Sequence, residues 1–293
     1  MFFEKTTTFL LFFVLLFNFS TFAQGGENAM TWWPPGEYMR QALNNTLSKA
    51  VVVSHKTEYK FRRGVAFLAT HLQTGEQISY EMRLNAGEKY VFIGGGDDDV
   101  TDCNLYLKKD GRVYEKDVED DANPVISFTP LESGIYEIVY ELKGDEKEAS
   151  FVALALMSPD GYDISAEEVD QATNKILTYG SYINDEAGVK IHDGANQWGL
   201  FGTLLPSNMR IEISDMKLGD ADHYAIAAGA DALSDADLQL TEMQSGRVVA
   251  EDRKNDPTPG ISFTTVAAKT YALNIINVSS TKPAIIITML LTK

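Results

Sequence analysis

Two acidic motifs carry the side chains best suited to metal binding. Seven carboxylate or amide side chains make up these motifs: Asp97, Asp98, Asp99, Asp102, Asn104, Asp235 and Asp237. Calcium takes six to eight oxygen ligands, and carboxylates close together on a loop supply several of them. We therefore predict Ca²⁺ as a cofactor at these residues. The alternative is that the aspartates serve only as solvated turn residues.

The sequence gives little support for other catalytic chemistry. Its 4 histidines are scattered without the spacing of a metal site, and its single cysteine, Cys103, stands beside acids that keep a thiol protonated. It contains no G-x-S-x-G nucleophile motif. Paired carboxylates for glycoside hydrolysis remain an alternative in so acidic a chain, although no pair stands out. We therefore expect a protein that is not an enzyme.

Trp32 and Trp33 are the candidate ligand-binding aromatic residues. They precede Pro34 and Pro35 in a short N-terminal tail, residues 24–35. Flat aromatic faces stack on sugars and peptides, so an exposed tryptophan pair could form a platform for such a ligand. The alternative is that the two rings pack the tail onto the first domain.

The acidic motifs lie at matching places in an internal repeat. A block of residues occurs twice, and both copies contain the run Ile-Ser-Phe-Thr, at 126–129 and at 261–264. A repeat distance of about 135 residues is the size of a domain rather than of a solenoid unit. We therefore predict two copies of one module, at residues 36–158 and 159–293, with a run of turn residues at the boundary.

Each module is predicted to begin with a helix and to continue as strands. Apolar residues at spacings of three and four indicate helices over 36–54 and 165–182, the second with a capping box formed by Ser165 and Glu168. Short alternating segments separated by turn residues follow in both modules. We therefore predict a mainly β protein made of two similar antiparallel β-sandwich, jelly-roll-like domains, each preceded by one α-helix.

The repeated block resembles a known family, the bacterial pre-peptidase C-terminal domains and related collagen-binding-type jelly rolls. The matching pieces of the first copy are Asp102–Leu107, Gly111, Ile126–Phe128 and Gly134–Tyr136, and those of the second are Asp235–Leu240, Gly246, Ile261–Phe263 and Lys269–Tyr271. Asn104 stands where the family has Asp, and Lys269 replaces the turn Gly. The resemblance implies a non-catalytic appendage of the kind found on secreted enzymes, in some cases with bound calcium.

Net charge excludes several kinds of partner. The chain has 42 acidic and 25 basic residues, which gives a net charge of −17. Nucleic acid is a poor partner, because binding it depends on lysine and arginine side chains that neutralise phosphates. Anionic membrane surfaces are disfavoured for the same reason.

The N-terminus reads as an export signal. Residues 1–23 contain Lys5, an apolar run from Phe9 to Phe19, and a small residue, Ala23, before the expected cut. This apolar run is shorter than the roughly 20 residues that span a bilayer, so we expect no membrane insertion after cleavage. The predicted location is secreted or periplasmic, in a bacterium.

Together these features predict an exported, non-catalytic binding or accessory protein, with calcium as a candidate stabilising ion. Its expected partner is an extracellular protein or a carbohydrate. The alternatives are a secreted hydrolase that uses paired carboxylates and a purely structural surface component.

Overall fold

The computed structural model describes residues 33–147, 149–193 and 197–293. The predicted signal peptide, residues 1–23, and Trp32 lie outside the described residues. In the described ranges, neither helix is long and apolar enough to cross a membrane.

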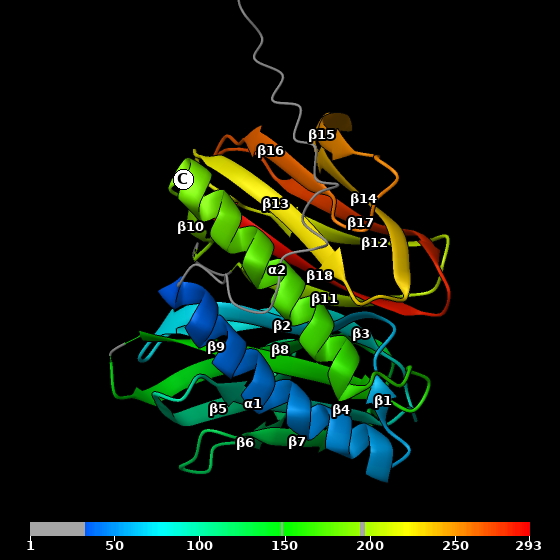
Figure 1. The fold of residues 1–293 in the computed structure, drawn as a ribbon. Coiled ribbons are helices and arrows are strands. Elements are labelled where there is room, and N and C mark those ends of the chain that lie inside the picture. Colours follow the sequence, from blue (N-terminus) through cyan, green and yellow to red (C-terminus); the bar gives the residue numbers. More distant parts are fainter. Residues whose placement is uncertain (1–32, 148, 194–196) are drawn as a thin grey trace, which may run out of the picture. The chain divides into compact units, whose positions relative to one another are not determined.

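Two helices and a large set of antiparallel strands make up residues 33–293 (Figure 1). The helices are α1 (Pro34–Lys56) and α2 (Ala166–Ala187). The strands of the first half are β1 (Lys60–Phe61), β2 (Gly64–Gln73), β3 (Gln77–Leu84), β4 (Tyr90–Gly96), β5 (Val100–Lys109), β6 (Arg112–Asp117), β7 (Val125–Phe128), β8 (Gly134–Asp145) and β9 (Ala149–Ser158). The strands of the second half are β10 (Lys190–Ile191), β11 (Leu200–Leu205), β12 (Met209–Met216), β13 (Asp222–Gly229), β14 (Leu233–Glu242), β15 (Arg247–Asp252), β16 (Gly260–Thr264), β17 (Tyr271–Ser280) and β18 (Ala284–Thr292).

The strands form one large sheet and two smaller ones. The large sheet has the order β16-β13-β18-β11-β2-β9-β4-β7, and the smaller sheets have the orders β3-β8-β5-β6 and β12-β17-β14-β15. One apolar core fills the space between the large sheet and the small sheets, and a second lies between the large sheet and the two helices. Both helices therefore cover the same face of the large sheet (Figure 1).

Both halves of the chain follow the same strand order. The first half pairs β2-β9-β4-β7 in one sheet and β3-β8-β5-β6 in the other, and the second half repeats this order from β11 to β18. This alternation between two sheets is the jelly-roll arrangement. The predicted fold class, mainly β with antiparallel sandwiches and a helix before each set of strands, is confirmed. The prediction that residues 36–158 and 159–293 are separate domains stays a prediction.

Strands β2 and β11 join the two halves into one continuous sheet. They pair antiparallel, with Leu68 opposite Phe201 and Phe67 opposite Gly202. A methyl group at Gly202 would lie 2.1 Å from the ring of Phe67, so the glycine makes room for that ring. Pairing β2 with β11 also removes two exposed strand edges.

Local sequence explains where the helices begin and end. Ser165 caps α2 by accepting a hydrogen bond from the Glu168 N–H, and Glu168 accepts one from the Ser165 N–H, as the predicted capping box requires. Gly188 ends α2 with a φ of 65°, in the left-handed region. Helix α1 begins with a proline, whose missing N–H costs nothing in the first turn.

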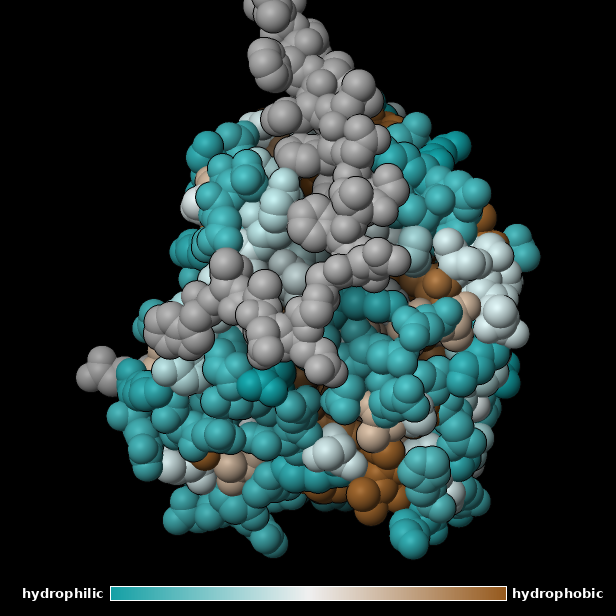
Figure 2. All heavy atoms as spheres, in the orientation of Figure 1, coloured by the Kyte–Doolittle hydropathy of each residue, from teal (hydrophilic) through white to brown (hydrophobic). Residues whose placement is uncertain are grey.

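Figure 2 shows hydrophilic side chains over most of the visible face, in keeping with the acidic composition. Hydrophobic side chains gather over the last turns of α1, where Val52 is 58% exposed. A small exposed apolar group of this kind is normal on soluble proteins.

The contact between Gly202 and Phe67 generates a stability prediction. Gly202→Ala places a methyl group inside the Phe67 ring, and we expect the free energy of unfolding to fall by about 1–3 kcal/mol. Gly134→Ala is the matched control, because its new methyl group meets only the flexible end of the Lys109 side chain, at 3.1 Å. Urea unfolding of both variants measures the difference. Equal stability of the two variants would contradict a tightly packed junction.

Candidate functional site

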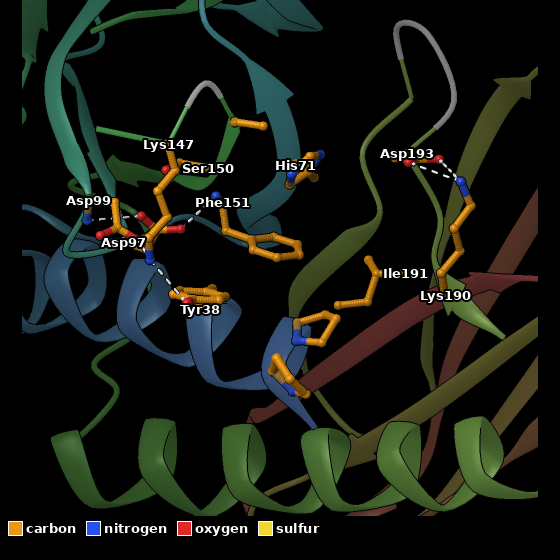
Figure 3. A pocket seen from close by; sticks show the side chains of 13 residues that line it. Tyr38, His71, Asp97, Asp99, Lys147, Ser150, Phe151, Lys190, Ile191 and Asp193 are labelled. Atoms are coloured by element: carbon orange, nitrogen blue, oxygen red, sulfur yellow. Dashed lines mark hydrogen bonds and ion pairs between the residues drawn. The ribbon is translucent and has the colours of Figure 1, made fainter. Parts of the chain in front are cut away.

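A pocket of about 290 Å³ lies at the start of α1 and takes its lining from both halves of the chain (Figure 3). Its apolar walls come from Pro34, Pro35 and Tyr38 of α1, Phe151 of β9 and Ile191 of β10. We call it the junction pocket. Aromatic and proline walls of this kind suit a ligand with an apolar or flat body.

Charged side chains stand at two ends of the junction pocket (Figure 3). At one end, Lys147 Nζ lies 2.5 Å from Asp99 Oδ2 and donates a hydrogen bond to Tyr38 Oη at 3.0 Å. The same Nζ lies 4.5 Å from the centroid of the Tyr38 ring. At the other end, Lys190 Nζ lies 3.1 Å from Asp193 Oδ1. The hydrogen bonds to Asp99 and Tyr38 raise the pKa of Lys147, so its ammonium group is charged at neutral pH.

Asp97 is buried in the wall of the junction pocket. Its side chain accepts hydrogen bonds from the Phe151 N–H at 2.8 Å and from the Asp99 N–H at 3.2 Å. Burial raises its pKa, and the two backbone N–H groups partly oppose this rise. Asp97 therefore holds Phe151 and the backbone of Asp99 in place.

Asp97 also borders a second hollow, of about 370 Å³. Asn45, Lys49 and Asp98 line this hollow. Asn45 Nδ2 donates to Asp98 Oδ1 at 3.0 Å, so Asp98 faces α1 rather than its neighbour Asp99. Residues of the Asp97–Asp99 loop thus line two hollows.

The other predicted calcium residues lie elsewhere, on β5 and β14. Asn104 Nδ2 donates to Glu141 at 2.8 Å. Asp102 and Asp235 each lie at a β-bulge, and each has one buried carboxylate oxygen without a hydrogen-bond partner in the described residues. Burial raises the pKa of both carboxyl groups, and it also raises that of Asp237.

The predicted residues are therefore only partly brought together. Asp97 and Asp99 share the junction pocket, and Asp97 and Asp98 share the second hollow. In the part of the chain that the structure describes, no group of three or more His, Cys, Asp or Glu side chains could hold a metal ion. Calcium stays a prediction from the sequence, and we derive no role for it from this geometry.

Trp33 is a buried residue at the beginning of α1. It is 9% exposed and occupies the N-cap position of the helix. A methyl group at Gly180 of α2 would lie 2.9 Å from the Trp33 ring, so the ring packs between the two helices. Trp33 is therefore a packed side chain; Trp32 lies outside the described residues, and a ligand platform formed by the pair stays a prediction from the sequence.

Two histidines that the sequence analysis treated as scattered lie together. His192 and His223 are 4% and 1% exposed, and their ring centroids are 5.4 Å apart. Both Nδ1 atoms lie within hydrogen-bonding distance of Thr292 Oγ1, at 2.7 and 3.0 Å. Burial is the main cause that lowers the pKa of His192, to about 4. Burial also lowers the pKa of His223. Only the pairing of β10 and β13 with β18 brings these residues together, so sequence spacing could not reveal them.

Comparison with known proteins yields no family. No family model and no curated protein matches the chain. Among solved structures, PliG from Aeromonas hydrophila, a periplasmic inhibitor of g-type lysozyme, is 16% identical in sequence. The match covers 33% of this chain and 87% of PliG, with a TM-score of 0.27. The PBSX exported protein XepA is 11% identical (76% and 84% covered, TM-score 0.23). The major capsid protein P2 from bacteriophage PM2 is 13% identical (78% and 97% covered, TM-score 0.19). Similarity at these TM-scores carries no argument about function.

The predicted calcium site can be tested by thermal unfolding. If the acidic motifs bind Ca²⁺, millimolar calcium raises the unfolding midpoint of the wild type above its value in EDTA, because a ligand of the folded state stabilises it. The Asp98→Ala/Asp102→Ala double variant should then show no such shift. A wild-type midpoint that is the same in calcium and in EDTA would contradict the prediction.

The buried histidine pair predicts loss of stability in mild acid. The pKa of His192 is about 4 in the folded protein and 6.5 in the unfolded chain, so between these values only the unfolded chain binds a proton at this side chain. Stability therefore falls as the pH falls, by about 2 kcal/mol between pH 6.5 and pH 5 from His192 alone.

Urea unfolding across this pH range measures the effect. His192→Gln should flatten the pH dependence, and His55→Gln, which changes an exposed histidine, is the matched control. An equal slope in wild type and His192→Gln would show that His192 does not contribute.

Proposed function

We propose that this protein is a non-catalytic binding protein that acts outside the cytoplasm and holds a small ligand in the junction pocket. The observation that carries this proposal is the make-up of the pocket: apolar and aromatic walls with a few charged groups at its ends. Binding sites for small molecules are concave, mostly apolar, and contain a small number of polar groups that orient the ligand. The volume, about 290 Å³, suits a ligand of the size of a monosaccharide or an amino acid.

The charged groups of the junction pocket support binding rather than catalysis. Asp97 and Asp99 both line the pocket. A hydrolase at this place would use these two carboxylates as its catalytic pair. However, Asp97 is 4% exposed and accepts two backbone N–H groups. A general acid or base must be within reach of the substrate and able to exchange a proton with it. With Asp97 committed to the backbone, Asp99 has no second free carboxylate beside it, which fits a binding site better than a hydrolase.

The position of the pocket favours a ligand that stabilises both halves. Tyr38 and Phe151 belong to the first half, while Ile191 and Lys190 belong to the second. A ligand in contact with all four side chains would bind only the assembled protein. Its binding would then add to the stability of the whole chain. A carbohydrate partner, as expected from the sequence, would occupy this pocket as a single sugar unit or a chain end.

A thermal-unfolding screen tests the pocket. Small amines, amino acids, monosaccharides and short peptides are added at millimolar concentration to the wild type, to Ala149→Phe and to Ala268→Phe. Ala149 lines the pocket, so the first variant fills it, whereas Ala268 is exposed in the second half and serves as the matched control. We expect a compound that raises the wild-type midpoint, keeps this effect in Ala268→Phe and loses it in Ala149→Phe.

Two outcomes would overturn the proposal. One is that no compound in these four classes stabilises the wild type. The other is that every stabilising compound acts equally on Ala149→Phe, which would place its binding site elsewhere.

A further inference from the structure

We propose that the end of the junction pocket formed by Tyr38 and Asp99 binds the ammonium group of an organic amine, and that Lys147 occupies this place when the ligand is absent. The inference rests on the proposed binding function and names the class of ligand. It follows from the groups that surround the Lys147 ammonium, from the freedom of Lys147 to leave, and from the charge that remains when it does.

The surroundings of the Lys147 ammonium are those of a recognition site for an organic cation. Its Nζ lies 2.5 Å from Asp99 Oδ2 and 4.5 Å from the centroid of the Tyr38 ring. A carboxylate and an aromatic face attract a cation by charge and by the ring quadrupole respectively. Asp97 fixes the backbone of Asp99, since it accepts the Asp99 N–H at 3.2 Å. The ammonium of Lys147 shows where a ligand ammonium would lie.

Lys147 can leave this place at little cost. Its side chain is 50% exposed, and it belongs to the turn between β8 and β9. A half-exposed ion pair gains little free energy, because both charges are well solvated when apart and a long side chain loses rotamer freedom when it is held. The Asp99 side chain, by contrast, is 19% exposed, and the backbone N–H of Asp99 donates to Asp97. Tyr38 and Asp99 therefore stay in place, while the Lys147 side chain can move.

A ligand would gain contacts that Lys147 lacks. From the Tyr38 end the pocket continues along Phe151 and Ile191 toward Lys190 and Asp193 (Figure 3). An alkyl or aryl ammonium could place its charge at Asp99 and its body against these two apolar side chains. Burial of that body would add hydrophobic free energy to the charge pairing that the ligand takes over from Lys147.

Charge favours a cation in this pocket. Asp97, Asp99 and Asp193 line it together with Lys147, Lys190 and the imidazole of His71, so three carboxyl groups face two ammonium groups. When Lys147 swings out, three carboxyl groups face one ammonium group, that of Lys190. The net charge of −17 on the whole chain also raises the local concentration of cations. An anionic ligand would meet the opposite field.

Removal of Lys147 gives a direct test. n-Butylammonium has the same four-carbon chain and charge as the lysine side chain, and its binding is measured by calorimetry and by thermal unfolding. Because Lys147 is an intramolecular competitor held only by a half-exposed ion pair, we expect Lys147→Ala to bind n-butylammonium about three- to fivefold more tightly than the wild type. The neutral n-butanol should not bind either protein.

Lys175→Ala is the matched control. Lys175 also forms an exposed ion pair, with Asp231 at 2.7 Å, but that pair does not line the junction pocket. This variant should bind n-butylammonium no better than the wild type. A second variant, Lys147→Ala/Asp99→Asn, removes the carboxylate as well and should lose the gained affinity.

The outcomes separate this inference from the proposed function. Equal binding of n-butylammonium to Lys147→Ala and Lys175→Ala overturns the ammonium site. If, in addition, a non-amine compound stabilises the wild type and not Ala149→Phe, the pocket is a ligand site of another class. Binding that persists in Lys147→Ala/Asp99→Asn also overturns the inference, because the affinity then does not come from Asp99.

Discussion

The pairing of β2 with β11 is the constraint on which the rest of the structure depends. Each half has the strand order of a jelly roll, and the two orders meet edge to edge at this pair. An unpaired edge strand leaves backbone groups open to other chains, so this pairing protects both edges at once. It also places both helices on one face of a single sheet, where Trp33 packs against Gly180. The junction pocket exists because the two halves meet in this way.

The sequence predicted the fold class because its signals are local. Alternating apolar residues indicate strands, apolar spacings of three and four indicate α1 and α2, and the capping box at Ser165 marks the start of α2. The β2–β11 pairing has no such signal. Residues 64–72 and 198–205 read only as buried strands, and many partners could bury them. The choice of partner depends on tertiary details, such as the space that Gly202 leaves for Phe67.

The candidate site was likewise predictable only where its residues are neighbours in the sequence. Asp97 and Asp99 stand out because they belong to a run of three aspartates, whereas the residues that contact them do not stand out. Lys147 lies 48 residues from Asp99 and 109 residues from Tyr38 along the chain. No sequence motif links residues that far apart. Sequence reasoning therefore assigned the aspartates to calcium, the ligand that acids in a loop suggest on their own. Lys147, a cation from another turn, is a partner that no local pattern indicates.

The buried position of Asp97 shows that the acidic loop is more than a solvated turn. A solvated turn would keep its carboxylates in water, whereas Asp97 is 4% exposed, and burying a carboxylate costs free energy. The Phe151 and Asp99 N–H groups offset part of this cost, and in doing so they fix the backbone at both residues. The residues held in this way are an aromatic wall of the junction pocket and the carboxylate at its end. The cost of burying Asp97 is therefore coupled to the rigidity of the pocket, as expected where a site must be ordered before its ligand arrives.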